Sequence, residues 1–499
     1  MPSSILCFVR FLNGMRHKLY KAMMKPSHVF LLVFCVFFVQ IHAKNLLAHE
    51  KISIESPSIH IDSNQVLPLW LPLSEIILQN TVVWARNHYI MDYNYAKISL
   101  STWKANLNHS WTWDNNHFAI NFFGHPYQGV YYHAAARSSG LNFYKSLVYD
   151  MFGSFTWEFF GEREKPSLND FVITSFAGAM YGEILFRLAE RLLAKKSPSY
   201  WDHSLAFAMQ PYSYIHQQVF GKRPNNPGYV PIEFSIFGGI GSRFESDYRY
   251  DKKPAKRLDD NWKDVFGVGG FDLVYGKANR IIKKPLEYFT VSASHEEGKK
   301  NRLFQMEVLG KIKNSHKSAK NDFFDIATYS AYDLFYGSLV EMSAFSLGLG
   351  TDISVHLISK IHFRVYSISS IVVLGATDFN YDDILKEFYP EYEPTRTYQI
   401  SYGLNYKTGF SARYKQLEFM HKSNIFLLKT MPGSLPHYGA DGWDIVGFNY
   451  SDLNFYLHQK FNFGIGLKHY FKVSAYSGEY LEPMSRTMLS TNVHIRYHF

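Results

Sequence analysis

The segment from Leu489 to Phe499 alternates between two kinds of side chain. Its odd positions carry Leu, Thr, Val, Ile, Tyr and Phe, whereas its even positions carry Ser, Asn, His, Arg and His. Because successive side chains of a strand point to opposite faces of the sheet, the segment predicts a strand with one apolar face and one polar, partly cationic face. Soluble β-sandwiches and transmembrane β-barrels both contain such strands, so the pattern alone leaves both classes open.

Further segments with a period of two follow one another from Pro231 onward. The clearest are 400–406 and 461–475, and weaker ones lie around 232–244, 264–276, 287–296, 302–313, 322–332, 337–350, 361–378, 410–430 and 443–459. With the terminal strand they make about twelve, an even number that is typical of a barrel. The connections are predicted to alternate as well: long ones at 379–395, 431–442 and 477–486 interleave with short ones, such as Lys407-Thr408-Gly409 and the turn near Lys460.

A strand of this kind that ends the chain on Phe499 resembles the closing strand of bacterial outer-membrane β-barrels, in which the terminal Phe belongs to the assembly signal. The resemblance implies two partners: outer-membrane lipid and the barrel assembly machinery. The predicted fold class is α+β, with an amino-terminal helical domain at 68–229 followed by an antiparallel transmembrane β-barrel of about 12 strands at 230–499.

The composition agrees with a barrel and excludes two other classes. Aromatic residues make up 17% of the chain, with 36 Tyr and 42 Phe, yet the mean hydropathy is only −0.19. An α-helical membrane protein would be far more hydrophobic, whereas a barrel places its apolar residues at alternate positions and adds aromatic girdles. The net charge is +9, but no compact basic cluster with interleaved aromatics is present, so we expect no nucleic-acid partner.

Residues 1–43 are predicted to be a secretory signal peptide. A basic stretch precedes the apolar run Val29–Val39, which is too short to span a bilayer, and Ala43 offers a plausible cleavage point. An uncleaved anchor is the alternative. Both cysteines, Cys7 and Cys35, lie in this region, so the mature chain would have no thiol, which suits an oxidising compartment in which no disulfide is used.

The polar segment 44–67 is predicted to be a linker that leads into the helical domain. Within that domain, Ser167 can cap a helix that continues to about Leu193. Other helices are predicted from Ser74 to about 84 and at 130–137, 141–160 and 199–221. We expect this domain in the periplasm or partly filling the barrel, with a position against the inner leaflet as a further alternative.

Several short motifs follow one another between residues 120 and 190. They are Phe123-Gly124-His125-Pro126-Tyr127-Gln128-Gly129, Trp157-Glu158, Phe160-Gly161-Glu162, Pro166-Ser167, Asn169-Asp170 and Gly182-Glu183. In this order they resemble the bacterial family catalogued as domain of unknown function 3943. The family brings no assigned activity, so the resemblance supports an envelope protein without supplying a mechanism.

The same region supplies the candidate catalytic residues, which are His125, Arg137, Glu158, Asp170 and Glu183. A His or a carboxylate can act as a general base, and an Arg can stabilise an oxyanion. Each also has a structural interpretation: Asp170 begins a helix, Glu183 forms an i,i+4 ion pair with Arg187, and His125 belongs to a turn before Pro126. Asp170 and Glu183 face apart on an ideal helix, so they should not form a carboxylate pair.

We expect neither a metal nor a cofactor. His494 and His498 have His-x-x-x-His spacing, but on a predicted strand they lie about 13 Å apart and cannot share a metal. No cysteine pair has ligand spacing, and the phosphate-cradling and dinucleotide-binding fingerprints are absent from the sequence. The predicted protein is therefore an outer-membrane barrel that serves envelope structure or the passage of a small solute, with inward-facing Asn, Lys, His and Arg side chains lining it. The alternative is a membrane-embedded lipid hydrolase or acyl transferase that uses the 124–183 region.

Overall fold

The computed structural model describes residues 66–222, 224, 230–249, 262–299, 301–319, 322–338, 340–357, 360–379, 381, 385–386, 391, 396–436, 439–478 and 481–499. The predicted signal peptide, and all but the last two residues of the predicted linker, lie outside these residues.

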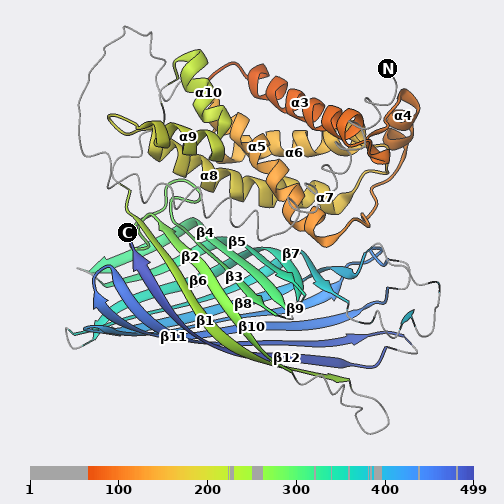
Figure 1. Ribbon diagram of the computed structural model, residues 1–499. Helices are drawn as coiled ribbons and strands as arrows, with labels where there is room; N and C mark the ends of the chain where they lie inside the picture. Colours follow the sequence, from red (N-terminus) through yellow and green to blue (C-terminus); the bar gives the residue numbers. More distant parts are fainter. Residues whose placement is uncertain are drawn as a thin grey trace, which may run out of the picture.

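The amino-terminal half of the described chain is helical (Figure 1). Its elements are α3 (Trp70–Ala85), η1 (Arg86–Ile90), η2 (Asn94–Ala96), α4 (Leu100–Asn108), η3 (Ile120–Gly124), α5 (His125–Ser138), α6 (Phe143–Thr156), η4 (Trp157–Gly161), α7 (Leu168–Val172), η5 (Ile173–Ala177), α8 (Gly178–Leu193), α9 (Tyr200–Met209) and α10 (Pro211–Phe220). The helix predicted after Ser167 is α7, η5 and α8 in sequence, and the Ser167 side chain caps it by accepting from the backbone N–H of Asp170, as expected. By length and composition this helix, Leu168–Leu193, could cross a membrane, but most of it is buried, as in the core helix of a soluble domain.

The carboxy-terminal half is a closed antiparallel barrel of twelve strands, which confirms the predicted fold class. The strands are β1 (Ile232–Arg249), β2 (Trp262–Tyr275), β3 (Phe289–Gly298), β4 (Arg302–Ala319), β5 (Asp322–Gly337), β6 (Glu341–Leu357), β7 (Ile361–Asp378), β8 (Tyr398–Tyr414), β9 (Leu417–Thr430), β10 (Gly442–His458), β11 (Phe461–Tyr476) and β12 (Met484–His498). Each strand pairs with its sequence neighbours, and β1 pairs with β12 to close the ring.

One predicted turn is wrong. Lys407-Thr408-Gly409 lies inside β8, and the chain reverses instead at Lys415–Gln416, between β8 and β9. The prediction relied on residue types that often form turns. In the structure Lys407 faces the barrel interior, and Gly409 lies under the ring of Tyr366, where a Cβ at Gly409 would come within 2.7 Å of that ring. Gly beneath a cross-strand aromatic ring is a known way of accommodating glycine within a strand.

The terminal strand shows which way the barrel side chains point. Leu489, Val493 and Ile495 are 46%, 41% and 60% exposed, whereas the polar side chains at the intervening even positions are buried, including His494 and Arg496. The apolar face of β12 is therefore the outer face of the barrel, as predicted, and its polar face lines the interior.

The helical domain lies along the outside of the barrel wall (Figure 1). On β5, Asp333 points inward and pairs with Lys407 of β8 at 2.5 Å. The neighbouring Tyr332 therefore points outward, and its hydroxyl donates to the backbone oxygen of Phe122 in η3 at 2.6 Å. The alternative that the domain partly fills the barrel is wrong, because the domain packs on the outward-facing residues of the wall.

A single apolar cluster joins the helices to this wall. Its buried members are Phe118, Phe122, Ile173, Ala177, Met180, Ile184 and Leu188 from the helical domain and Leu273, Tyr275, Phe289, Val308, Tyr332, Leu334, Phe345, Leu374, Ala376, Tyr398 and Ile400 from the strands, with Leu286 from the β2–β3 connection. Polar contacts fasten the domain at both rims: Arg187 donates to the Pro285 oxygen beside β2 and β3, and Arg396, just before β8, donates to the Asp114 oxygen. The domain thus extends from one rim of the barrel to the other.

Candidate functional site

The structure divides the five candidate residues into two groups. His125, Glu158 and Asp170 come together, whereas Arg137 and Glu183 belong to a separate ion-pair network that also contains His133 and Asp150. As predicted, Asp170 and Glu183 do not form a pair.

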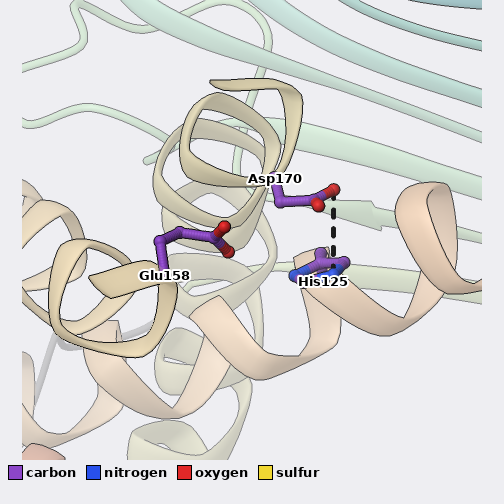
Figure 2. Close-up of side chains that lie close together, drawn as sticks. All are labelled: His125, Glu158 and Asp170. Atoms are coloured by element: carbon purple, nitrogen blue, oxygen red, sulfur yellow. Dashed lines mark ion pairs between the residues drawn. The ribbon is translucent and has the colours of Figure 1, made fainter. Parts of the chain in front are cut away.

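The first group joins three segments of the helical domain (Figure 2). His125 begins α5, Glu158 lies in η4 and Asp170 lies in the first turn of α7. One ligand atom from each residue lies within 4.8 Å of the others. The three residues are 7%, 3% and 3% exposed, so the group lies in the interior of the domain.

Hydrogen bonds orient each of these side chains. The His125 Nδ1 is 3.3 Å from the Thr174 hydroxyl, and its Nε2 faces Asp170, whose Oδ1 lies 3.7 Å away. Glu158 Oε2 accepts from the backbone N–H of Ser167 at 2.8 Å, and Asp170 Oδ1 accepts from the Asn169 amide at 2.8 Å. The turn predicted at His125 is therefore wrong, because His125 begins helix α5 and its imidazole faces a hydroxyl and a carboxylate.

π-helical turns accompany all three positions: η3 ends immediately before His125, η4 contains Glu158, and η5 follows α7, which contains Asp170. A π turn inserts an extra residue into a helix and changes the direction in which the side chains point, and such turns occur frequently at functional sites. No local sequence pattern predicts these π-helical turns, so the proximity of the three side chains could not be predicted from the sequence.

The first group is rich in acid. Burial raises the pKa of Glu158 well above its ordinary range, and the carboxylates of Asp170, Glu162 and Asp114 raise it further. Burial likewise raises the pKa of Asp170, with Asp114 adding to the effect. Burial lowers the pKa of His125, against the carboxylates of Glu162 and Asp114. The site therefore gathers several carboxylates around an imidazole that tends to be neutral.

In the second group, by contrast, cationic side chains surround the buried carboxylate of Glu183. Glu183 is fully buried, and its carboxylate accepts from Arg137 at 2.6 Å and contacts Arg187 at 2.9 Å, the latter being the predicted i,i+4 pair. His133 lies 3.2 Å from Glu183 and 2.7 Å from Asp150. Burial acts to raise the pKa of Glu183, but the two guanidinium groups outweigh it and hold that pKa far below its usual range. This is a compensated structural network.

Two glycines bring α5 and α8 close enough for this network. A Cβ at Gly178 would lie 2.6 Å from the Cα of Gly129, and a Cβ at Gly182 would lie 2.5 Å from the Cβ of His133. The close approach sets His133 beside Glu183. His133 and Asp150 were missed by sequence reasoning, although His133 lies one helical turn before Arg137 and so shares its face.

The network predicts a pH dependence. Burial acts to lower the pKa of His133, but Asp150 and Glu183 outweigh it and raise that pKa, while burial raises the pKa of Asp150 to about 6. Both groups hold a proton more tightly in the folded state. The contribution of Asp150 is therefore lost as pH rises from its ordinary pKa of 3.8 to about 6, and that of His133 is lost as pH rises above its ordinary pKa of 6.5. We expect the free energy of unfolding of the helical domain to fall more steeply over this range than in a His133→Gln variant, measured by denaturant unfolding at several pH values. Equal slopes would contradict this assignment.

Inside the barrel, side chains meet across the lumen. Phe335 of β5 stacks on Phe448 of β10 with ring centroids 3.6 Å apart, within an apolar layer that also includes Leu303, Met342, Val372, Phe426, Val446, Tyr470 and Met488. Ion pairs bridge strands that are far apart in the ring, including Lys407 to Asp333 at 2.5 Å and Lys468 to Glu296 at 2.6 Å. The inward-facing Asn, Lys, His and Arg residues were predicted, but the apolar layer was not.

A closed antiparallel barrel with an apolar outer wall, and with polar and charged side chains in its interior beside the apolar layer, defines a transmembrane β-barrel of the outer membrane. The protein is thus an outer-membrane β-barrel protein with a helical domain on the outside of its wall.

Comparisons with known proteins find one family model that matches part of the helical half. Residues 110–212 match the model of the family described as "Domain of unknown function (DUF3943)", which confirms the resemblance found from the motifs and covers both groups of site residues. No curated protein matches the chain.

Among solved structures, an outer membrane channel from Pseudomonas putida is 10% identical, with 55% of this chain and 99% of that chain covered and a TM-score of 0.29. The KdgM porin is 11% identical, with 52% and 99% covered and a TM-score of 0.22. The toluene transporter TodX from Pseudomonas putida is 5% identical, with 54% and 89% covered and a TM-score of 0.23. The assignment to the outer membrane rests on the closed barrel and its apolar wall.

Proposed function

We propose that the protein is a structural component of the outer membrane, whose barrel is closed to free solutes at rest and holds the helical domain beside it. The contact between Phe335 and Phe448 carries this proposal, because it joins nearly opposite sides of the ring. Porin-type barrels keep a water-filled interior. Here an apolar layer and bridging ion pairs occupy that space.

The outer face of the helical domain supports a position at the membrane. On α3, which lies on the far side of the domain from the barrel (Figure 1), Trp70, Ile77, Leu78 and Val82 are 65%, 52%, 63% and 59% exposed. Large apolar side chains gathered on one helix face are typical of contact with a membrane or a partner. The partners that we propose are outer-membrane lipid and, during folding, the barrel assembly machinery at the terminal strand.

The enzymatic alternative gains no support from this geometry. His125, Glu158 and Asp170 are almost fully buried, so an acyl chain would reach them only after the helices had rearranged. Glu183 and Arg137 are occupied by each other.

Conductance in planar bilayers tests the closed barrel. We expect the purified protein to give no steady conductance, and a Phe335→Ala/Phe448→Ala double variant to give a measurable one, because removing both rings empties the middle of the apolar layer. An Ile240→Ala variant, altered at a side chain that is 65% exposed on the outer face, is the matched control and should stay closed. Faster migration of unboiled samples on a gel shows that each barrel is folded. A steady conductance of the unaltered protein would overturn the proposal.

A further inference from the structure

We propose that His125, Glu158 and Asp170 bind one divalent transition-metal cation, of the class to which Zn²⁺, Mn²⁺ and Fe²⁺ belong. The proposal is independent of the closed barrel and concerns the interior of the helical domain. One imidazole nitrogen and two carboxylate oxygens form a ligand set suited to these ions, whereas Ca²⁺ and Mg²⁺ prefer oxygen ligands alone.

The spacing of the ligand atoms comes close to what such an ion requires. Zn²⁺ holds nitrogen and oxygen ligands at about 2.0–2.2 Å, so two ligand atoms of one ion lie no more than about 4.4 Å apart. In the structure one atom from each of the three residues lies within 4.8 Å of the others. Small rotations of the Glu158 and Asp170 side chains would close this difference.

The orientation of His125 is that of a metal ligand. A ligating imidazole uses one nitrogen for the metal and the other for a hydrogen bond that fixes the ring. Here Nδ1 lies 3.3 Å from the Thr174 hydroxyl, while Nε2 points into the group, 3.7 Å from Asp170 Oδ1, which is too long for a hydrogen bond. His125 is only 7% exposed, so a nitrogen directed at a buried carboxylate without a hydrogen bond to it calls for another partner.

The two carboxylates are held in the same manner. The backbone N–H of Ser167 fixes one oxygen of Glu158, and the Asn169 amide fixes one oxygen of Asp170. Such outer contacts orient ligands and are a regular part of metal sites.

The charges around Glu158 also favour a bound cation. The buried Glu183 in the same domain is compensated by Arg137 and Arg187, whereas the charged groups that act on Glu158 are the carboxylates of Asp170, Glu162 and Asp114. Buried carboxylates are costly unless they take up protons, pair with a cation or coordinate a metal, and the raised pKa of Glu158 and of Asp170 favours the protonated form when no metal is bound. A divalent cation would compensate this group as the guanidinium groups compensate Glu183, and it would tie α5, η4 and α7 together.

Metal content and thermal unfolding of the full-length protein in detergent test the proposal. After treatment with a chelator and addition of Zn²⁺ alone, we expect one ion to stay with each chain through gel filtration and to raise the unfolding temperature of the helical domain. In a Glu158→Gln/Asp170→Asn double variant the affinity for Zn²⁺ should fall by at least about tenfold, and the rise in unfolding temperature should disappear. Mn²⁺ serves as a second probe.

The control is Asp150→Asn, which alters a fully buried carboxylate of the other network and should retain the ion. Without metal, the double variant should unfold at or above the temperature of the metal-free unaltered protein, because neutral amides remove the repulsion among buried carboxylates. A folded double variant that retains Zn²⁺ as well as the unaltered protein does would overturn the proposal. So would an unaltered protein that neither retains Zn²⁺ nor changes its unfolding temperature.

Discussion

Glu183→Gln should destabilise the helical domain by about 3–5 kcal/mol, because the change removes the anionic partner of a buried network and leaves its cations uncompensated. Glu183 is fully buried between Arg137 and Arg187, with His133 on its third side. A glutamine can replace some of the hydrogen bonds but none of the charge.

Denaturant unfolding followed by tryptophan fluorescence measures this loss, and the barrel is followed separately by the migration of unboiled protein on a gel. Glu164→Gln, at an exposed position of the same domain, should change the free energy of unfolding by less than about 0.5 kcal/mol. If the Glu183→Gln variant unfolds at the same denaturant concentration as the unaltered protein, the network does not stabilise the domain.

Glu158 and Glu183 should respond differently when their charge is removed. Both residues are buried glutamates of one domain, yet Glu183 contacts two guanidinium groups, whereas the charged groups acting on Glu158 are carboxylates. Neutralising Glu183 should therefore be costly, and neutralising Glu158 in the metal-free protein should not. If burial alone decided the outcome, both substitutions would change the free energy of unfolding in the same direction.

The barrel could be predicted from the sequence because its signal is local. A strand with lipid on one face and a polar interior on the other must alternate with a period of two, and β12 shows this pattern from Leu489 to its end. Boundaries within one long strand were harder to place. In β8, Lys407 and Gly409 have turn-forming residue types, but their contacts with Asp333 and Tyr366 come from other strands.

The position of the helical domain could not be predicted, because a wall residue that faces helices has the same chemistry as one that faces lipid. Tyr332 and Leu334 fit the alternation of a lipid-facing strand but pack against the domain. The candidate site shows the same limit. His125, Glu158 and Asp170 were identified as chemically interesting, yet they meet only through the packing of three helical segments. Their spacing along the chain matches no short ligand motif.

Ile184→Asp should separate the helical domain from the barrel. Ile184 is 4% exposed in the apolar cluster between α8 and the wall, one turn after Met180, whose sulfur accepts from the Ser330 hydroxyl of β5. A carboxylate at this position would be buried without a cation, or protonated at a cost, and we expect a loss of about 3–5 kcal/mol from the contact. Ile184→Val, which keeps the surface apolar, should cost only about 0.5–1.5 kcal/mol.

Hydrogen exchange of α8 measures the separation, because amides of a helix that leaves its packing surface exchange faster. We expect faster exchange in Ile184→Asp and little change in Ile184→Val, with the faster migration of the unboiled protein preserved in both. The barrel should survive because its own strand pairs close the ring and its interior contacts do not involve the helices. Failure of the Ile184→Asp barrel to assemble would contradict this expectation. It would mean that the helical domain is needed for folding of the barrel, because the strands that it covers are stabilised by the helices where other strands are stabilised by lipid.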